Sequence, residues 1–123
     1  MATPQEIRDR ITITPESRAV TVRFHGAIIA STREALRLEE KGYDPVFYIP
    51  RDRVETAFLH ATQKRTTCPY KGEASYWSIS AEGRAAENAV WSYETPHDGV
   101  REIADAMAFR GDGVQVETDG TPA

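Results

Sequence analysis

Short runs with a two-residue hydrophobic period constrain this chain more than any other feature of its sequence. In the run AVTVRF, Val20, Val22 and Phe24 alternate with Thr21 and Arg23. This alternation is typical of a β-strand with one face in a core and the other in water. Runs with strand character recur at 27–31, 35–40, 45–50, 74–80, 84–94 and 113–117. They predict a mainly β, antiparallel structure.

Helical spacing appears in one region, residues 51–62. Val54, Ala57 and Phe58 are spaced as on one face of a helix, and Asp52 could cap its start. We therefore predict a short helix there. A single helical turn is a second possibility at the start of residues 98–109, where Met107 to Phe109 could instead be extended.

The length of 123 residues fits a single domain spanning residues 1–123. Its polar first ten residues, and residues 118–123 without an apolar anchor, are expected to be loosely ordered, which leaves a folded core of about 11–117.

The net charge of −4 counts against a nucleic-acid partner. No run approaches the ~18 apolar residues of a membrane helix, so no membrane partner is expected. A cytoplasmic location is expected, because the N-terminus lacks an apolar signal sequence and one cysteine forms no internal disulfide.

The hairpin around residues 81–83 decides which side chains share a face. A two-residue turn would place Trp77 opposite Asn88, whereas a three-residue turn with Gly83 left-handed would place Trp77 opposite Glu87. We favour the three-residue turn, because glutamate at position 82 tolerates positive φ poorly. That register gathers Trp77, Glu87, Trp91 and Tyr93 on one face. Aromatic rings with a few convergent polar groups describe a ligand pocket, and the alternative is that both tryptophans are core residues.

The stretch TTCPYKGEASYW leads into this hairpin. Cys68-Pro69 favours an extended entry into a turn that Tyr70 and Lys71 continue, and Gly72 can complete it with positive φ. Cys68 is the one candidate catalytic nucleophile, with Lys71 able to stabilise its thiolate. The alternative is that Cys68 is a small apolar residue, buried or half-buried.

Metal and cofactor sites are not expected. One cysteine and three scattered histidines do not supply the paired ligands of a zinc site. The sequence has neither GxxxxGK[ST] nor GxGxxG, so no phosphate-binding loop is predicted. Arg51, in YIPRDR, could bind a carboxylate or phosphate at the rim of the pocket, or could lie on a solvated helix start.

The strings FYIPRDRV, TTCPYKGEASYW and ENAVWSYETP, in this order, resemble the domain of unknown function 427 family over roughly Val20 to Glu117. The resemblance implies a small β-tent, or Mss4-like, fold with one or two short helices. Some β-tent relatives bind zinc through two cysteine pairs, which this chain lacks, and some hold ligands in an aromatic cage. The family is sometimes labelled nucleotidyltransferase-like, but the closely spaced aspartates after a Gly-Ser turn that such enzymes use are absent here.

Together these features predict a domain that binds a small molecule in an aromatic-lined pocket. The alternative is an enzyme, nucleotidyltransferase-like or dependent on Cys68, and a third class is an interaction protein using the strand edge at 45–50. The predicted ligand-binding residues are Arg51, Cys68, Tyr70, Lys71, Trp77, Glu87, Asn88, Trp91 and Tyr93.

Overall fold

A computed structural model describes residues 2–119 and 121–122, and within this part the strands form three antiparallel sheets. One sheet has the order β1-β4-β5, formed by Ile11–Pro15, Leu36–Glu40 and Val46–Tyr48. Another has the order β11-β10-β2-β3, formed by Thr121–Pro122, Val114–Thr118, Val20–Phe24 and Ala27–Thr32. A third has the order β6-β7-β8-β9, formed by Leu59–Cys68, Gly72–Ala81, Arg84–Ser92 and Met107–Phe109. The helical segments are α1 (Pro4–Arg10) and the 3-10 helices η1 (Arg51–Arg53), η2 (Thr56–Phe58) and η3 (Asp98–Ile103).

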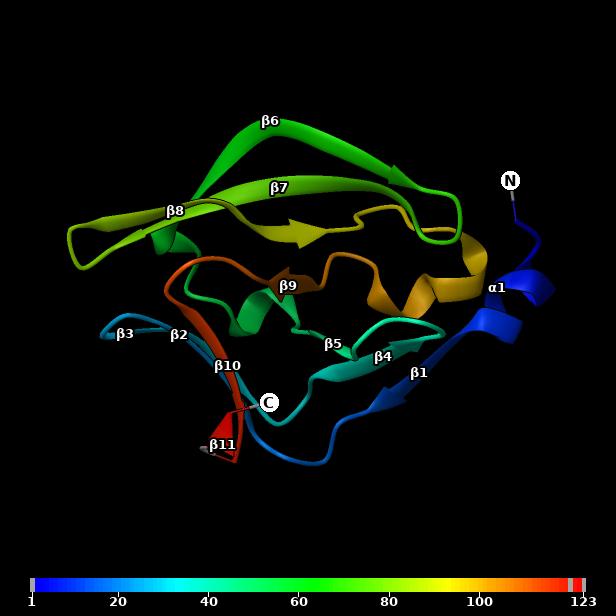
Figure 1. Cartoon of the computed structure of the whole chain (residues 1–123), viewed down its shortest axis with the longest axis horizontal. Helices are drawn as coiled ribbons and strands as arrows, with labels where there is room; N and C mark the ends of the chain where they lie inside the picture. Colours follow the sequence, from blue (N-terminus) through cyan, green and yellow to red (C-terminus); the bar gives the residue numbers. More distant parts are fainter. Residues whose placement is uncertain (1, 120, 123) are drawn as a thin grey trace.

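The sheet β6–β9 arches over the other two sheets, as Figure 1 shows. Ile49, just after β5, exchanges two backbone hydrogen bonds of 2.8 Å with Met107 of β9, and so ties the β1-β4-β5 sheet to the arching sheet. Apolar side chains gather in two clusters. One lies between the arching sheet and strands β2, β3 and β10, and the other among α1, η3, β4, β5 and the opposite end of the arching sheet.

The predicted antiparallel, mainly β class is confirmed. The alternation in β2 has the expected result, because Val20, Val22 and Phe24 are fully buried while the residues between them are half-buried. The helical turn expected near residue 98 is η3, and Met107–Phe109 is extended as β9. No helix among the described residues has the length and apolar character needed to cross a membrane.

The helix predicted over residues 51–62 is wrong. Two separate 3-10 turns occupy 51–58, and β6 begins at Leu59. Leu59 pairs with Ile79 and Ala61 with Trp77, so the backbone groups that a helix would satisfy locally are satisfied by β7. The spacing that suggested a helical face instead reflects tertiary contacts, since Val54 bridges to Ala30 of β3.

The expectation of a loosely ordered N-terminus also differs from the structure. Residues 4–10 form α1, whose start has a capping box in which Thr3 and Glu6 exchange side-chain-to-backbone hydrogen bonds. Ile7 of this helix is 1% exposed in the second cluster. At the other end, Thr118 is buried and pairs with Val20, while residues 120 and 123 lie outside the described part.

The β7–β8 hairpin has a two-residue turn, which corrects the favoured three-residue turn. Ala81 pairs with Arg84, and both central residues, Glu82 (φ 56°) and Gly83 (φ 69°), are left-handed. Such a turn matches the right-handed twist of the strands, and this gain outweighs the unfavourable conformation of glutamate. A bulge follows, in which residues 87–89 lie opposite the single residue 78 and Asn88 has a φ of 53°.

As a result, the two tryptophans lie on opposite faces of the sheet. Trp77 pairs with Val90, and Tyr76 pairs with Trp91. Because successive residues of a strand point to opposite faces, Trp91 shares the face of Tyr76 and not that of Trp77. The bulge shifts the pairing by two residues. Because this number is even, side chains beyond the bulge stay on the faces that the turn assigns to them. The predicted gathering of Trp77, Glu87 and Trp91 on one face is therefore wrong.

Candidate functional site

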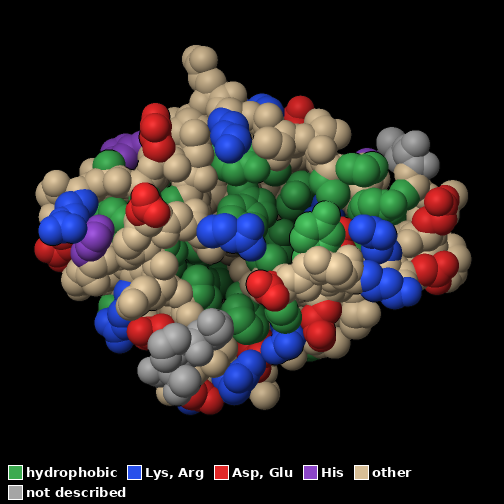
Figure 2. Space-filling model, in the orientation of Figure 1, with side chains coloured by type: hydrophobic (Ala, Val, Ile, Leu, Met, Phe, Trp, Pro, Cys, Tyr) green, Lys and Arg blue, Asp and Glu red, His purple; other side chains and the backbone are tan. Residues whose placement is uncertain are grey.

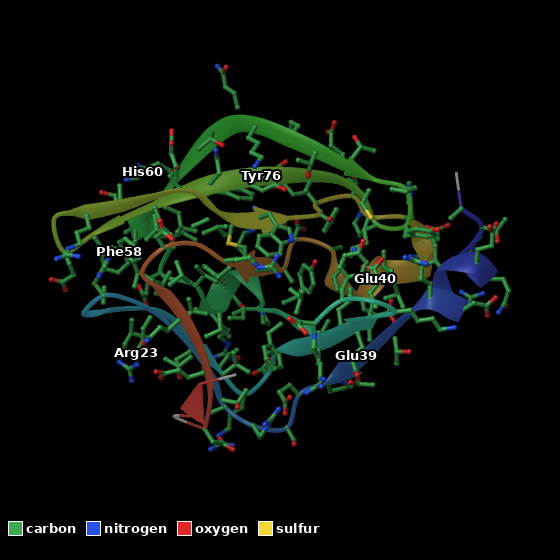
Figure 3. All side chains as sticks on the ribbon, viewed as in Figure 1. Arg23, Glu39, Glu40, Phe58, His60 and Tyr76 are labelled. Carbon is green, nitrogen blue, oxygen red and sulfur yellow. The ribbon has the colours of Figure 1, made fainter. Side chains whose placement is uncertain are left out.

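A cleft of about 1120 Å³ opens between strands β4–β5 and the face of the arching sheet that carries Trp91. Figure 3 labels Glu40 on β4 and Tyr76 on β7, two of the strands that contribute to its walls. We call this space the aromatic cleft. Its lining includes the rings of Tyr43, Tyr48, Tyr70, Tyr76, Trp91 and Tyr93. Its polar lining comes from Arg10, Glu40, Asp44, Lys64, Cys68, Lys71, Asn88 and Arg110.

Six of the residues predicted from sequence to bind a ligand line this cleft, and three do not. Those in the cleft are Cys68, Tyr70, Lys71, Asn88, Trp91 and Tyr93. Those outside it are Arg51, Trp77 and Glu87.

The turn between β6 and β7 places the first three of them. Cys68 pairs with Gly72, and the three residues between them form the predicted turn. Gly72 has a φ of 114°, a conformation that only glycine adopts readily, as its position in the sequence suggested. The backbone N–H of His97 donates to the carbonyl of Lys71 at 3.0 Å, which fastens the turn to the segment after β8.

Lys71 and Glu40 form a largely buried ion pair in the cleft. Lys71 Nζ lies 2.7 Å from Glu40 Oε1, and these side chains are only 12% and 11% exposed. Arg10 Nε approaches the other carboxylate oxygen at 3.4 Å. Lys71 Nζ also lies 3.7 Å from Cys68 Sγ. The ammonium of Lys71 thus contacts both the carboxylate of Glu40 and the thiol of Cys68.

Sequence reasoning missed Glu40, although a signal for it was present. Leu36, Leu38 and Glu40 alternate in one strand, so they share a face by the same period that predicted the strand. A carboxylate on the apolar face of a strand requires a partner, since an unpaired buried charge is costly. The partners are Arg10 and Lys71, which approach from distant parts of the chain.

Tyr48 was also missed, and it joins the cleft to the core. Its hydroxyl accepts a hydrogen bond of 3.3 Å from Trp91 Nε1, and its ring centroid lies 6.5 Å from that of Tyr93. Burial raises the pKa of Tyr48 to about 12 and also raises the pKa of Tyr93. Both phenols therefore remain protonated near neutral pH and can take part in hydrogen bonds without carrying charge.

Arg51 and Trp77 form a separate structural contact on the other face of the sheet. The Arg51 guanidinium lies 5.0 Å from the ring centroid of Trp77 and donates to Glu94 at 3.1 Å and to Ser92 Oγ at 3.2 Å. It also donates to the carbonyl of Asp105 at 3.1 Å. Arg51 thus holds η1 against the end of β8 and does not reach the aromatic cleft.

Glu87 is exposed on the bulge of β8. The same bulge holds Asn88 at the cleft wall, where the backbone N–H of Asn88 donates to Ser78 Oγ at 3.0 Å. The hydroxyl of Thr62 donates to Asn88 Oδ1 at 2.6 Å. No set of three metal-ligating side chains occurs among residues 2–119.

The fold and the cleft together define a small antiparallel β protein with an aromatic-lined recess between two of its sheets. Residues 12–120 match the family described as Domain of unknown function (DUF427), and the chain belongs to this family. This agrees with the resemblance carried by the sequence strings around Cys68 and Trp91. The curated proteins with which the sequence was compared include no match.

Proposed function

We propose that this domain binds a small molecule in the aromatic cleft. The observation that carries the proposal is the convergence of the Lys71–Glu40 pair, Asn88 and the ring of Trp91 on one recess of ligand size. Ligand sites combine apolar and aromatic walls with a few oriented polar groups, and this recess has that composition. Rings such as that of Trp91 would supply contact area, while Asn88 and Lys71 would supply directional contacts.

The two tryptophans provide a direct test, because only Trp91 lines the cleft. We expect a fragment screen by two-dimensional NMR to find small molecules that shift the indole N–H signal of Trp91 but leave that of Trp77 unchanged. The Trp91→Ala variant should lose binding of these fragments by at least about tenfold, as expected when a central aromatic anchor is removed. Native mass spectrometry of freshly purified protein would additionally identify any molecule retained from the expression host.

Trp77→Phe is the matched control, since it alters the other face of the same sheet. It should keep fragment binding, and circular dichroism should show that both variants are folded. The proposal fails if no fragment perturbs the Trp91 signal, or if Trp77→Phe and Trp91→Ala weaken binding equally in folded protein.

A second candidate function, catalysis by Cys68, is favoured by the 3.7 Å contact between its sulfur and Lys71 Nζ. A neighbouring ammonium stabilises a thiolate, which is the nucleophilic form of cysteine. We expect iodoacetamide to alkylate Cys68 at pH 7 faster than it alkylates free cysteine, and Lys71→Gln to slow that reaction. Lys41→Gln, outside the cleft, is the control. Alkylation no faster than that of free cysteine, or unaffected by Lys71→Gln, would count against a catalytic thiol.

A further inference from the structure

A second hollow adjoins the aromatic cleft. It has a volume of about 970 Å³ and lies between β5 and strands β2, β9 and β10. We call it the apolar groove. The two spaces share four lining residues, which are Asp44, Val46, Trp91 and Arg110. Because the same side chains border both, the cleft and the groove are direct neighbours.

More aliphatic side chains line the groove than the cleft, although Arg18, Arg37 and Asp119 line it as well. Its apolar side chains are Val22, Pro45, Val46, Phe47, Ile49, Trp91, Phe109, Val114 and Val116. Of these, Phe47, Val114 and Val116 are only half-buried, so apolar surface in the groove is open to solvent. Figure 2 shows apolar side chains gathered in a hollow in the middle of this face, with Lys and Arg side chains near it. Contiguous apolar surface of this kind is typical of a binding site.

Two cations lie above the wall of the aromatic cleft. The Arg110 guanidinium carbon is 5.6 Å from the ring centroid of Trp91, and Lys64 Nζ is 4.7 Å from that of Tyr76. Tyr76 and Trp91 are direct partners across β7 and β8, so the two cations rest on neighbouring rings of one face.

The other cations that line either space have carboxylate partners. Arg10 and Lys71 bind Glu40, Arg18 binds Glu16 through its side chain at 2.9 Å, and Arg37 lies 3.5 Å from Glu39. Within residues 2–119, Arg110 and Lys64 form no such ion pair. Asp44, which borders both spaces, and Asp119, which borders the groove, form no such ion pair either within this part of the chain. Both are acids that a bound anion would have to avoid.

From these features we infer that the ligand is an anionic amphiphile, a single-chain carboxylate whose acidic group lies at Lys64 and Arg110 and whose apolar chain occupies the apolar groove. This inference rests on the proposed function and specifies its ligand class. The carboxylate of the ligand would supply the acidic partner that these two cations lack within the protein. Charge-assisted hydrogen bonds to Arg and Lys are stronger than neutral ones. The chain would cover half-buried apolar surface, which is favourable in proportion to its area.

The test compares decanoate, decanol and acetate by isothermal titration calorimetry with the full chain, below the concentration at which decanoate forms micelles. We expect decanoate to bind at least about tenfold more tightly than decanol, the factor that corresponds to one charge-assisted contact. Acetate should not bind detectably. Equal affinity for decanoate and decanol, or for decanoate and acetate, would overturn the inference.

Variants then distinguish the contribution of the two cations from that of the apolar groove. Arg110→Gln and Lys64→Gln should each weaken decanoate binding several-fold and leave decanol binding unchanged, whereas Val116→Gln should weaken both. Arg53→Gln is the matched control, because Arg53 is paired with Glu34 and lines neither space. If decanoate does not bind while fragments still shift the Trp91 signal, the ligand class is wrong and the proposed function stands.

Discussion

The hydroxyl of Tyr48 is the buried polar group that connects the aromatic cleft with the core. The Tyr48 residue is 1% exposed, so its ionised form would be poorly solvated, and burial raises its pKa from the ordinary 10.0 to about 12. In the unfolded chain the phenol loses its proton at the ordinary pKa. The folded state must therefore lose stability as the pH rises from about 10 to about 12, while no such effect operates below pH 10.

We predict that Tyr48→Phe makes stability less sensitive to alkaline pH. The free energy of unfolding, measured with urea at pH 8 and at pH 11, should fall more in the natural protein than in the variant. Burial, the main cause of the raised pKa of Tyr93, acts in both proteins, whereas the smaller contribution of Tyr48 to that pKa is lost in the variant. The loss of this contribution also makes the variant less sensitive to alkaline pH. Equal losses in the two proteins would show that burial of Tyr48 does not control this titration.

At the scale of elements, the β7–β8 hairpin decides what the cleft contains. Its two-residue turn sends Trp91 and Tyr76 to the cleft and Trp77 to the opposite face. Reasoning from the preferences of single residues favoured a three-residue turn, because it gave weight to the poor fit of Glu82 to positive φ. The pairing of the whole hairpin and its twist outweigh this local cost, which is about 1 kcal/mol for one left-handed residue.

Glu82→Asn tests this explanation. Asparagine accepts the left-handed conformation better than glutamate, and Asn-Gly is the preferred pair for such a turn. We expect the variant to be more stable by up to about 1 kcal/mol in urea unfolding. Glu73→Asn is the control, because Glu73 lies at an exposed strand position without positive φ. This variant should not raise the free energy of unfolding. A Glu82→Asn variant that is no more stable than natural protein would contradict the strain assigned to this turn.

At the scale of the whole molecule, two apolar clusters share the strands β7, β8 and β9. Trp77 packs against one cluster and Trp91 against the other. The paired hydrogen bonds between Ile49 and Met107 connect the β1-β4-β5 sheet to the arching sheet. Because long strands run through both clusters, neither cluster can lose its packing without exposing part of the other. The molecule should therefore unfold as one unit.

Single-tryptophan variants test whether the molecule unfolds as one unit. Trp77→Phe leaves Trp91 as the fluorescent reporter of one cluster, and Trp91→Phe leaves Trp77 to report on the other. Each variant should show the same urea midpoint by fluorescence as by far-ultraviolet circular dichroism. A fluorescence midpoint clearly below the circular dichroism midpoint in either variant would indicate that one cluster unfolds independently.

The sequence by itself determined strands β2 to β5, β7, β8 and β10, the turn at Cys68–Gly72 and the family, but not β1 or β6. These are properties of neighbouring residues, such as the alternation in Val20–Phe24 and the need for glycine at position 72. The same local signals indicated many of the cleft residues, because Cys68, Lys71 and Trp91 lie in one continuous part of the chain.

Only the tertiary structure decided the features that depend on contacts between distant parts of the chain. It replaced the helix predicted at 51–62 by two 3-10 turns and the start of a strand paired with β7. It also chose the hairpin register, and brought Glu40 to Lys71 and Tyr48 to Trp91. The physical reason is that pairing between strands and the burial of charge depend on partners distant along the chain. A local pattern shows which face a side chain occupies, but not which distant side chain will meet it there.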